Sequence, residues 1–144
     1  MINQTKGKLP SLPFVKIKDD ILGKDYSLSV AFVDEKTSKK INTTYRNKNK
    51  PTNILSFPLH KNEGELVLCN AVIRREAKSF EKTFSQFLGF LVIHGMLHLK
   101  GMKHSARMEK AEQAYDKKYF GGDRHRIPND KSRSGRIYFG RKKS

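Results

Sequence analysis

The sequence predicts a single α+β domain in which a small mixed β-sheet packs with about five α-helices. Its 144 residues are enough for one hydrophobic core. Short segments rich in β-branched and aromatic residues interleave irregularly with helical patterns. These strands are too few and too close together for a large doubly wound sheet, so we expect one layered domain.

The expected elements follow from apolar spacing and from residues that begin or end helices. In chain order they are a helix over 14–22, a strand over 26–33, a helix over 35–46, a strand over 53–58, a turn over 60–64, a strand over 65–69, and helices over 70–80, 84–99 and 106–119. Pro13 suits the first turn of the first helix, and Gly23 suits its end. Asp34 is a suitable N-cap for the next helix, and Pro51 prevents helix in the loop before the second strand.

The helix over 84–99 is expected to be the central one. Thr83 and Gln86 have the spacing of a capping box, and apolar residues then occupy nearly every face of the helix up to Leu99. A helix with this pattern is buried on all sides. Asn70 and Ser105 are candidate N-caps of the helices before and after it.

Basic residues outnumber acidic residues by a wide margin. Thirty lysines and arginines stand against fourteen aspartates and glutamates, which gives a formal net charge of +16. Such an excess makes a polyanion the expected partner. A charge that serves only solubility and attraction to an anionic membrane surface are the alternatives.

The single cysteine and the N-terminus predict a reducing compartment. Cys69 cannot form an internal disulfide, and it lies in an apolar run where a buried thiol is expected rather than a nucleophile. Residues 1–14 lack the apolar core of a secretory signal. The longest uncharged stretch, residues 83–99, contains two histidines and is too short for a membrane span. We therefore expect a cytoplasmic protein that does not contact a membrane.

Three of the five histidines lie in the segment HGMLHLKGMKH, residues 94–104. His94 and His98 are four residues apart and share one helix face, and Gly101 can adopt the positive φ that brings His104 back toward them. Three neutral imidazoles with an open fourth position are typical of a catalytic zinc site. We expect one Zn²⁺ per chain at the end of the central helix, with nickel, copper and iron as alternatives.

The same histidine spacing occurs in zinc peptidases, but one position differs. A peptidase carries its catalytic glutamate directly after the first histidine, where this chain has Gly95. Peptidase activity is therefore disfavoured. Hydrolysis remains feasible because zinc itself lowers the pKa of its bound water toward about 7. The other two histidines, His60 and His125, have no such neighbours and are expected at the surface.

Three segments match the pattern of a known family. INTTYRNKNKPTNILSFP, residues 41–58, resembles NxxYRxKxxPT(D/N)VLSFP, and GELVL, residues 64–68, stands where the family usually has GD(I/V)x(I/L). HGMLHLKGMKH corresponds to HGxLHLxGYDH. The chain thus resembles the YbeY family of bacterial and organellar endoribonucleases and ribosomal RNA maturation factors, over roughly residues 12–119.

The resemblance implies a fold, an activity and a set of site residues. It implies a single α+β domain that acts on single-stranded RNA in ribosome assembly, notably at the 3′ end of small-subunit RNA. The family's zinc ligands fall on His94, His98 and His104, and its functionally important arginine falls on Arg46. The guanidinium of Arg46 can grip a phosphate with two parallel hydrogen bonds and stabilise its charge in the transition state.

Neighbouring residues are candidate RNA contacts. Lys48 and Lys50 are expected to hold the RNA backbone electrostatically. Ser56 and Phe57 are expected to line the site with a hydroxyl and a stacking face. Without the family resemblance, an exposed loop cation is the favoured interpretation of Arg46, and Phe57 is an ordinary core residue.

Two positions depart from the family pattern. Lys103 replaces the aspartate before the last histidine, which exchanges a hydrogen-bond acceptor for a positive charge near the ion and can weaken metal binding. Glu65 replaces an aspartate, and this longer carboxylate preserves charge but not reach.

The chain is expected to divide into a catalytic domain over residues 1–120 and a basic tail over residues 121–144. The arginines of the tail, together with Tyr138 and Phe139, suit a disordered segment that contacts RNA. An inert polar terminus is the alternative.

The favoured hypothesis is a zinc-dependent endoribonuclease that is specific for single-stranded RNA and acts in ribosomal RNA processing. Its partners are then RNA and, in addition, the small ribosomal subunit or assembly proteins. An RNA-binding ribosome assembly factor with a mainly structural metal is the first alternative, and a metallopeptidase is the second.

Overall fold

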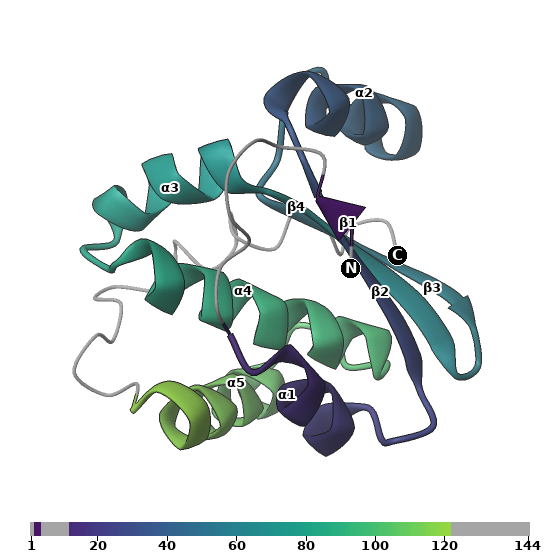
Figure 1. The fold of residues 1–144 in the computed structure, drawn as a ribbon, viewed down its shortest axis with the longest axis vertical. Helices are drawn as coiled ribbons and strands as arrows, with labels where there is room; N and C mark the ends of the chain where they lie inside the picture. Colours follow the sequence, from purple (N-terminus) through teal and green to yellow (C-terminus); the bar gives the residue numbers. More distant parts are fainter. Residues whose placement is uncertain (1, 4–11, 122–144) are drawn as a thin grey trace.

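The structure is a computed structural model that describes residues 2–3 and 12–121. In chain order its elements are β1 (Ile2–Asn3), α1 (Phe14–Ile21), β2 (Ser27–Val33), α2 (Glu35–Arg46), β3 (Ile54–His60), β4 (Glu63–Cys69), α3 (Asn70–Ser79), α4 (Phe84–Leu99) and α5 (Ala106–Phe120). Figure 1 shows α2 on one side of the sheet and α1, α4 and α5 on the other. The predicted α+β class is confirmed.

The sheet of the described residues has the strand order β1-β2-β4-β3. β2 runs parallel to both β1 and β4, and β3 runs antiparallel to β4, so the predicted mixed sheet is confirmed. The short strand β1 is not among the predicted strands. The turn between β3 and β4 is also tighter than predicted, because pairing continues to His60 and Glu63 through an irregularity at Pro58.

Three of the four predicted helix caps are present. The side chains of Asp34, Thr83 and Ser105 each accept a hydrogen bond from the backbone N–H three residues ahead. The prediction for Asn70 is wrong, because Cys69 is the N-cap and Asn70 is already the first residue of α3. The strand β4 therefore runs directly into a helix without a polar cap side chain.

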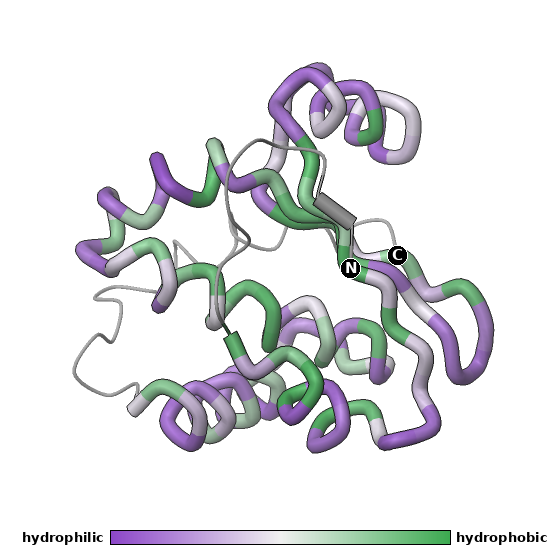
Figure 2. Tube along the Cα trace, viewed as in Figure 1, coloured by the Kyte–Doolittle hydropathy of each residue, from purple (hydrophilic) through white to green (hydrophobic). Residues whose placement is uncertain are grey.

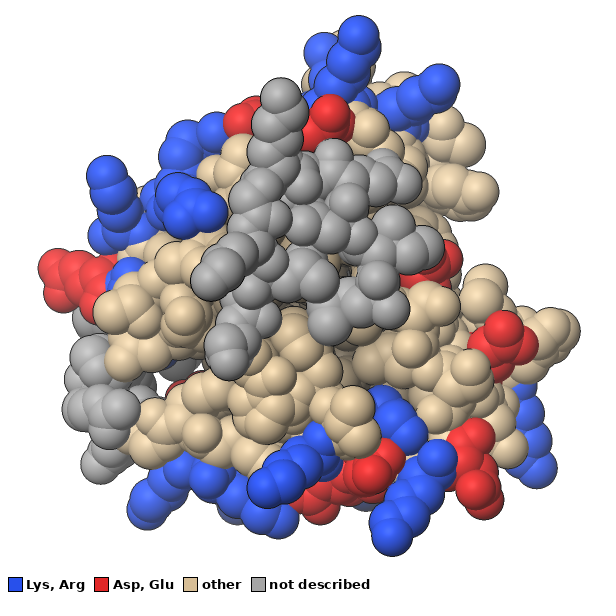
Figure 3. Space-filling view, viewed as in Figure 1, with Lys and Arg blue, Asp and Glu red and all other residues tan. Residues whose placement is uncertain are grey.

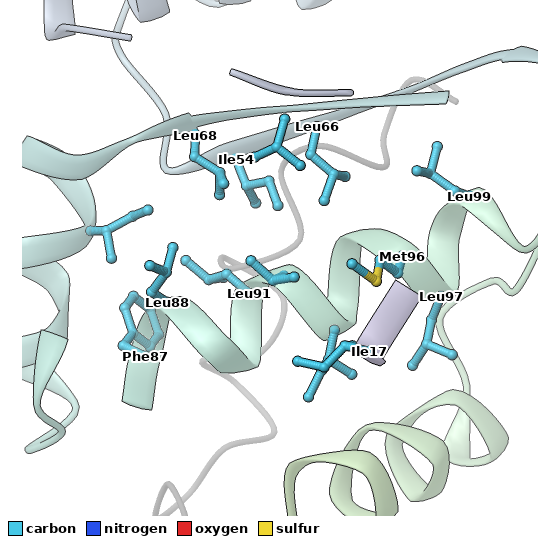
Figure 4. Packing of buried hydrophobic residues seen from close by; sticks show 14 of the residues in the cluster. Ile17, Ile54, Leu66, Leu68, Phe87, Leu88, Leu91, Met96, Leu97 and Leu99 are labelled. Atoms are coloured by element: carbon cyan, nitrogen blue, oxygen red, sulfur yellow. The ribbon is translucent and has the colours of Figure 1, made fainter. Parts of the chain in front are cut away.

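Most of the hydrophobic core lies between α4 and one face of the sheet. In Figure 4, Ile54, Leu66 and Leu68 on the strands face Leu91 and Met96 on α4. All five side chains are buried, and each such burial contributes about 1.5–3 kcal/mol. Helices α1, α3 and α5 pack around α4. Figure 2 shows the resulting contrast between a hydrophobic α4 and a largely hydrophilic α2.

The helix α2 covers the other face of the sheet. There a smaller cluster of Val33, Leu55 and Val67 packs with Ile41 of α2 and with Phe57. Successive residues of a strand point to opposite faces, so consecutive residues of β3 serve two different layers. This alternation separates two of the predicted site residues.

The remaining expectations for the domain concern Cys69, membranes and the tail. Cys69 is buried, and burial raises the pKa of its thiol, which agrees with a small apolar residue rather than a nucleophile. Among residues 2–3 and 12–121 there is no helix long and apolar enough to cross a membrane. His125, Tyr138 and Phe139, with the rest of the tail beyond Gly121, lie outside the described residues.

Candidate metal centre

Helix α4 carries the first two histidines, and the segment after it carries the third. His94 and His98 lie one turn apart near the C-terminal end of α4. Gly101 then adopts a φ of 104°, the positive value that its sequence position predicts. His104 follows just before α5 begins. The structure therefore brings the three histidines together from the elements that the spacing predicts.

The three imidazole rings surround a common point. One ring nitrogen of each histidine lies within 4.8 Å of the others. The ring centroids are 4.5 Å apart for His94 and His98, 5.2 Å for His98 and His104, and 5.5 Å for His94 and His104. His94 is buried, whereas His98 and His104 are half-buried. The cluster is thus closed around His94 and more accessible at His98 and His104.

Hydrogen bonds fix which nitrogen of two histidines faces the cluster. Nδ1 of His98 lies 3.1 Å from the backbone carbonyl of Met102, which only accepts, so this Nδ1 carries the proton. Nδ1 of His94 contacts the carboxylate of Glu112. Protons on both Nδ1 atoms leave both Nε2 atoms as lone-pair donors, and these lie 3.0 Å apart.

This donor set fits a divalent transition metal. Two unprotonated Nε2 atoms cannot hydrogen bond to each other, so their close approach is favourable when a cation lies beside both. Histidine ligands typically donate their second nitrogen to a carboxylate or a backbone carbonyl, and Glu112 and Met102 supply one of each. The site can therefore hold one metal ion.

Glu112 belongs to the site but is not among the site residues predicted from the sequence. It lies on α5 with a side chain 3% exposed, although a glutamate is almost never buried without a partner. Its spacing from Met108, which is also buried, places both residues on the inner face of α5. An acidic residue on the apolar face of an amphipathic helix is the signal that points to it.

Gly95 lies at the contact between α4 and the sheet. A Cβ atom at this position would lie 2.8 Å from Leu66, 2.9 Å from Ile54 and 3.1 Å from the hydroxyl oxygen of Ser56. Position 95 therefore faces packed strand residues, and any side chain there would displace the ends of their side chains. The catalytic glutamate that a zinc peptidase carries at this position would have to displace these strand side chains, which further disfavours the peptidase alternative.

Arg46 lies at the C-terminal end of α2, in the layer on the other face of the sheet. Its Nη1 lies 3.5 Å from Oδ1 of Asn42, and the residue is half-buried. The next residue, Asn47, ends the helix in the left-handed conformation, and the exposed Lys48 and Lys50 follow. The structure thus groups the three predicted cations at one end of α2.

Two buried polar residues of α2 hold this basic loop in place. Asn42 donates a hydrogen bond of 2.8 Å to the carbonyl of Lys50. The hydroxyl of Ser38 donates to the carbonyl of Thr52 and accepts from its N–H, both at 2.9 Å. A loop lacks regular backbone hydrogen bonding, and these side-chain hydrogen bonds take its place. They hold the loop against α2.

Ser56 and Phe57 lie on opposite faces of β3. Ser56 pairs with Leu66 and donates to the carbonyl of Gly95 at 3.4 Å, so it faces α4 and the histidine cluster. Phe57 packs with the α2 side of the sheet, against Leu55. The two candidate RNA contacts therefore lie on opposite faces of the sheet, because neighbouring strand residues point in opposite directions.

The two positions that depart from the family pattern, Lys103 and Glu65, lie in different parts of the structure. Lys103 is exposed, and its backbone carbonyl accepts a bond from Ser105. Glu65 pairs with Phe57 and is half-buried on the α2 side of the sheet. His60 is exposed, as predicted.

The chain is similar to named proteins over most of its length. A family model described as Endoribonuclease YbeY matches residues 12–119. Proteins named Endoribonuclease YbeY from Staphylococcus aureus strains JH9 and Newman are each 35% identical to this chain, and the alignments cover 70% of this chain and 74% of each relative. The solution structure of TM1509 from Thermotoga maritima is similar with a TM-score of 0.62 and 30% identity, covering 84% of this chain and 90% of that one. The chain belongs to the YbeY family of endoribonucleases.

Proposed function

We propose that this protein is a metal-dependent endoribonuclease that cleaves single-stranded RNA. The observation that carries the proposal is the convergence of His94 and His98, whose Nε2 atoms lie 3.0 Å apart while their Nδ1 atoms are held by Glu112 and Met102. The endoribonuclease relatives support RNA as the substrate.

His94, His98 and His104 are the proposed ligands of one Zn²⁺, and other divalent transition metals suit the same imidazoles. When bound, the ion supplies a Lewis acid and an activated water for hydrolysis. Glu112 and the Met102 carbonyl keep the protons of His94 and His98 on Nδ1, so that Nε2 of each remains available. The two half-buried rings leave an approach for substrate, which favours a catalytic over a mainly structural metal.

Arg46 is the proposed cation that stabilises charge on the reacting phosphate. Lys48 and Lys50 extend the positive charge along the loop and attract the RNA backbone. Ser56 contributes a hydroxyl on the face that carries the histidines. Figure 3 shows that lysines and arginines also crowd the visible surface over α2 and α3, which suits a polyanionic substrate.

The proposed setting is the maturation of ribosomal RNA in the cytoplasm, notably at the 3′ end of small-subunit RNA. The family membership and the net charge of +16 support this setting. The small ribosomal subunit or assembly proteins are the proposed further partners. We also propose that residues 1–120 form the catalytic unit and that the basic residues 121–144 add contacts to RNA.

The test combines metal analysis with RNA cleavage. Untagged protein is expected to contain close to one zinc per chain and to cleave a labelled single-stranded RNA faster than the same sequence in a duplex. A chelator and the substitution His98→Ala should each abolish cleavage. The exposed His60, replaced by alanine, is the matched control and should leave cleavage unchanged.

Two outcomes oppose the proposal. Cleavage that survives both the chelator and His98→Ala indicates a contaminating nuclease. Tight RNA binding and bound metal without cleavage favour the alternative, an RNA-binding assembly factor whose metal is mainly structural.

A further inference from the structure

We propose that Tyr45 and Phe57 form a stacking platform for an unpaired nucleobase, on the side of the sheet opposite the histidines. The inference rests on the proposed function only in that it takes single-stranded RNA as the ligand. Tyr45 is 63% exposed, and among the described residues only Val15 and Leu59 are likewise large, apolar and exposed. Leu59 lies two residues after Phe57 on β3, and Tyr45 contacts Phe57 from α2.

The two rings form an aromatic surface that is supported from behind by a hydrophobic cluster. Their centroids are 5.2 Å apart with an interplanar angle of 64°, an edge-to-face contact. Phe57 is anchored in the cluster of Val33, Leu55 and Val67, so it fixes the position of the more exposed Tyr45. An ordered tyrosine loses little conformational entropy when a base stacks on it, and stacking accepts any base.

The charges around the platform suit a nucleic acid rather than an uncharged protein surface. Arg46 follows Tyr45 directly, and Lys48 and Lys50 lie in the loop that Asn42 holds against α2. Alternating aromatic and cationic groups are the pattern that binds single strands, because bases stack while phosphates pair with the cations. Glu65 lies opposite Phe57 on β4, which favours a backbone path over the loop rather than over β4.

The edge of the sheet connects the platform with the histidine cluster. β3 is the last strand of the order β1-β2-β4-β3, and Figure 1 shows it at the border of the sheet. Phe57 and Ser56 are consecutive residues on its two faces, and Ser56 contacts Gly95, the residue after His94. An RNA strand that crosses the outer edge of β3 therefore passes from the platform to the metal centre.

Binding by metal-free protein tests the platform apart from cleavage. A labelled single-stranded RNA and an abasic oligonucleotide of equal length and charge are titrated at one fixed salt concentration. Tyr45→Ala is expected to weaken RNA binding by roughly 5- to 150-fold, the loss of stacking on one base, and to leave the abasic ligand within about twofold. Tyr45→Phe should retain RNA binding. Val15→Ala, which truncates an exposed apolar residue on α1, is the matched control.

The outcomes separate the platform from its alternatives. If Tyr45→Ala weakens the binding of the RNA and of the abasic oligonucleotide equally, Tyr45 acts only through the position of the basic loop. This result overturns the proposal. If Tyr45→Ala changes the binding of neither ligand, the proposal is also overturned, and a protein partner becomes the better occupant of this surface. Metal-dependent RNA cleavage without an effect of Tyr45 removes the platform alone, whereas base-dependent binding without cleavage removes the nuclease proposal alone.

Photocrosslinking locates the contact directly. A 5-iodouridine RNA bound to the unmodified protein is expected to crosslink to the tryptic peptide over residues 41–46, which contains Tyr45. Crosslinks confined to peptides outside residues 41–61 would place the bases elsewhere and overturn the proposal.

Discussion

Glu112 on α5 contacts Nδ1 of His94 on α4, and both side chains are buried. This contact joins the two helices at the histidine cluster. It also explains why a carboxylate is retained inside a domain whose other buried residues are mostly apolar.

Removing the Glu112 carboxylate is predicted to weaken metal binding. Glu112→Ala leaves Nδ1 of His94 without its acceptor, so we expect the zinc Kd to rise about 10- to 100-fold. Glu112→Gln keeps an acceptor oxygen and should lose less. Competition with a chromophoric chelator measures the Kd. Glu109→Ala, an exposed glutamate on the same helix, is the control, and an unchanged Kd in Glu112→Ala would remove the assigned role.

Metal removal is predicted to lower thermal stability. Zinc at about one hundred times its Kd stabilises the folded state by about 2.7 kcal/mol, which raises Tm by roughly 10 °C for a domain of this size. Calorimetry of the protein with zinc and with chelator measures the difference. His98→Ala should abolish the zinc effect, and His60→Ala should preserve it. An equal zinc effect in both variants would place the binding site outside the histidine cluster.

Filling the contact at Gly95 is predicted to destabilise the fold. Gly95→Ala brings a methyl group within 3.0 Å of Leu66 and Ile54, so we expect the free energy of unfolding to fall by about 1–3 kcal/mol. Urea unfolding measures the change. Ser85→Ala, at an exposed position of the same helix, should change stability by less than about 0.5 kcal/mol. A neutral Gly95→Ala would mean that α4 can move away from the sheet at little cost.

The contact between α1 and α5 is predicted to weaken in acid. Lys118 and Tyr119 both hydrogen bond to Asp20, at 2.6 and 2.7 Å, and they hold the pKa of its carboxyl below the ordinary value. A lowered folded pKa contributes stability above the unfolded pKa of about 3.9 and loses it as the pH falls through the folded value.

Asp20→Asn should therefore lower Tm by a few degrees or less at pH 7, since solvent screens this exposed cluster. The difference from the unmodified protein should vanish toward pH 2. Thermal unfolding across this range measures it, with the exposed Asp25→Asn as the control. A Tm difference that stays constant down to pH 2 would contradict the ionic origin of the contact.

Local sequence signals predicted much of the histidine cluster. The four-residue spacing of His94 and His98 defines one helix face, and Gly101 permits the turn that returns His104. The capping box at Thr83 fixes where that helix begins. Each of these features depends only on residues close together in the chain, which is why a pattern of spacing is sufficient to find them.

Local sequence patterns do not reveal features that depend on contacts between distant parts of the chain. Glu112 meets His94 only because α5 packs on α4, and the sequence shows it merely as one acidic residue in an amphipathic helix. Strand alternation alone predicts that Ser56 and Phe57 face opposite layers, as they do in the structure. The strand β1 was missed because two residues carry too little pattern to be recognised.

The hydrogen bond from His98 to the carbonyl of Met102 links the orientation of His98 to the backbone segment that follows α4. Residues 99–102, which carry this carbonyl, also lead through Lys103 to the third histidine, His104. Local unfolding of this segment would therefore displace both His98 and His104 from the proposed ion. An ion bound to all three rings would in turn stabilise the folded form of the segment. Occupancy of the centre and order of the connection between α4 and α5 are thus expected to rise and fall as one cooperative event.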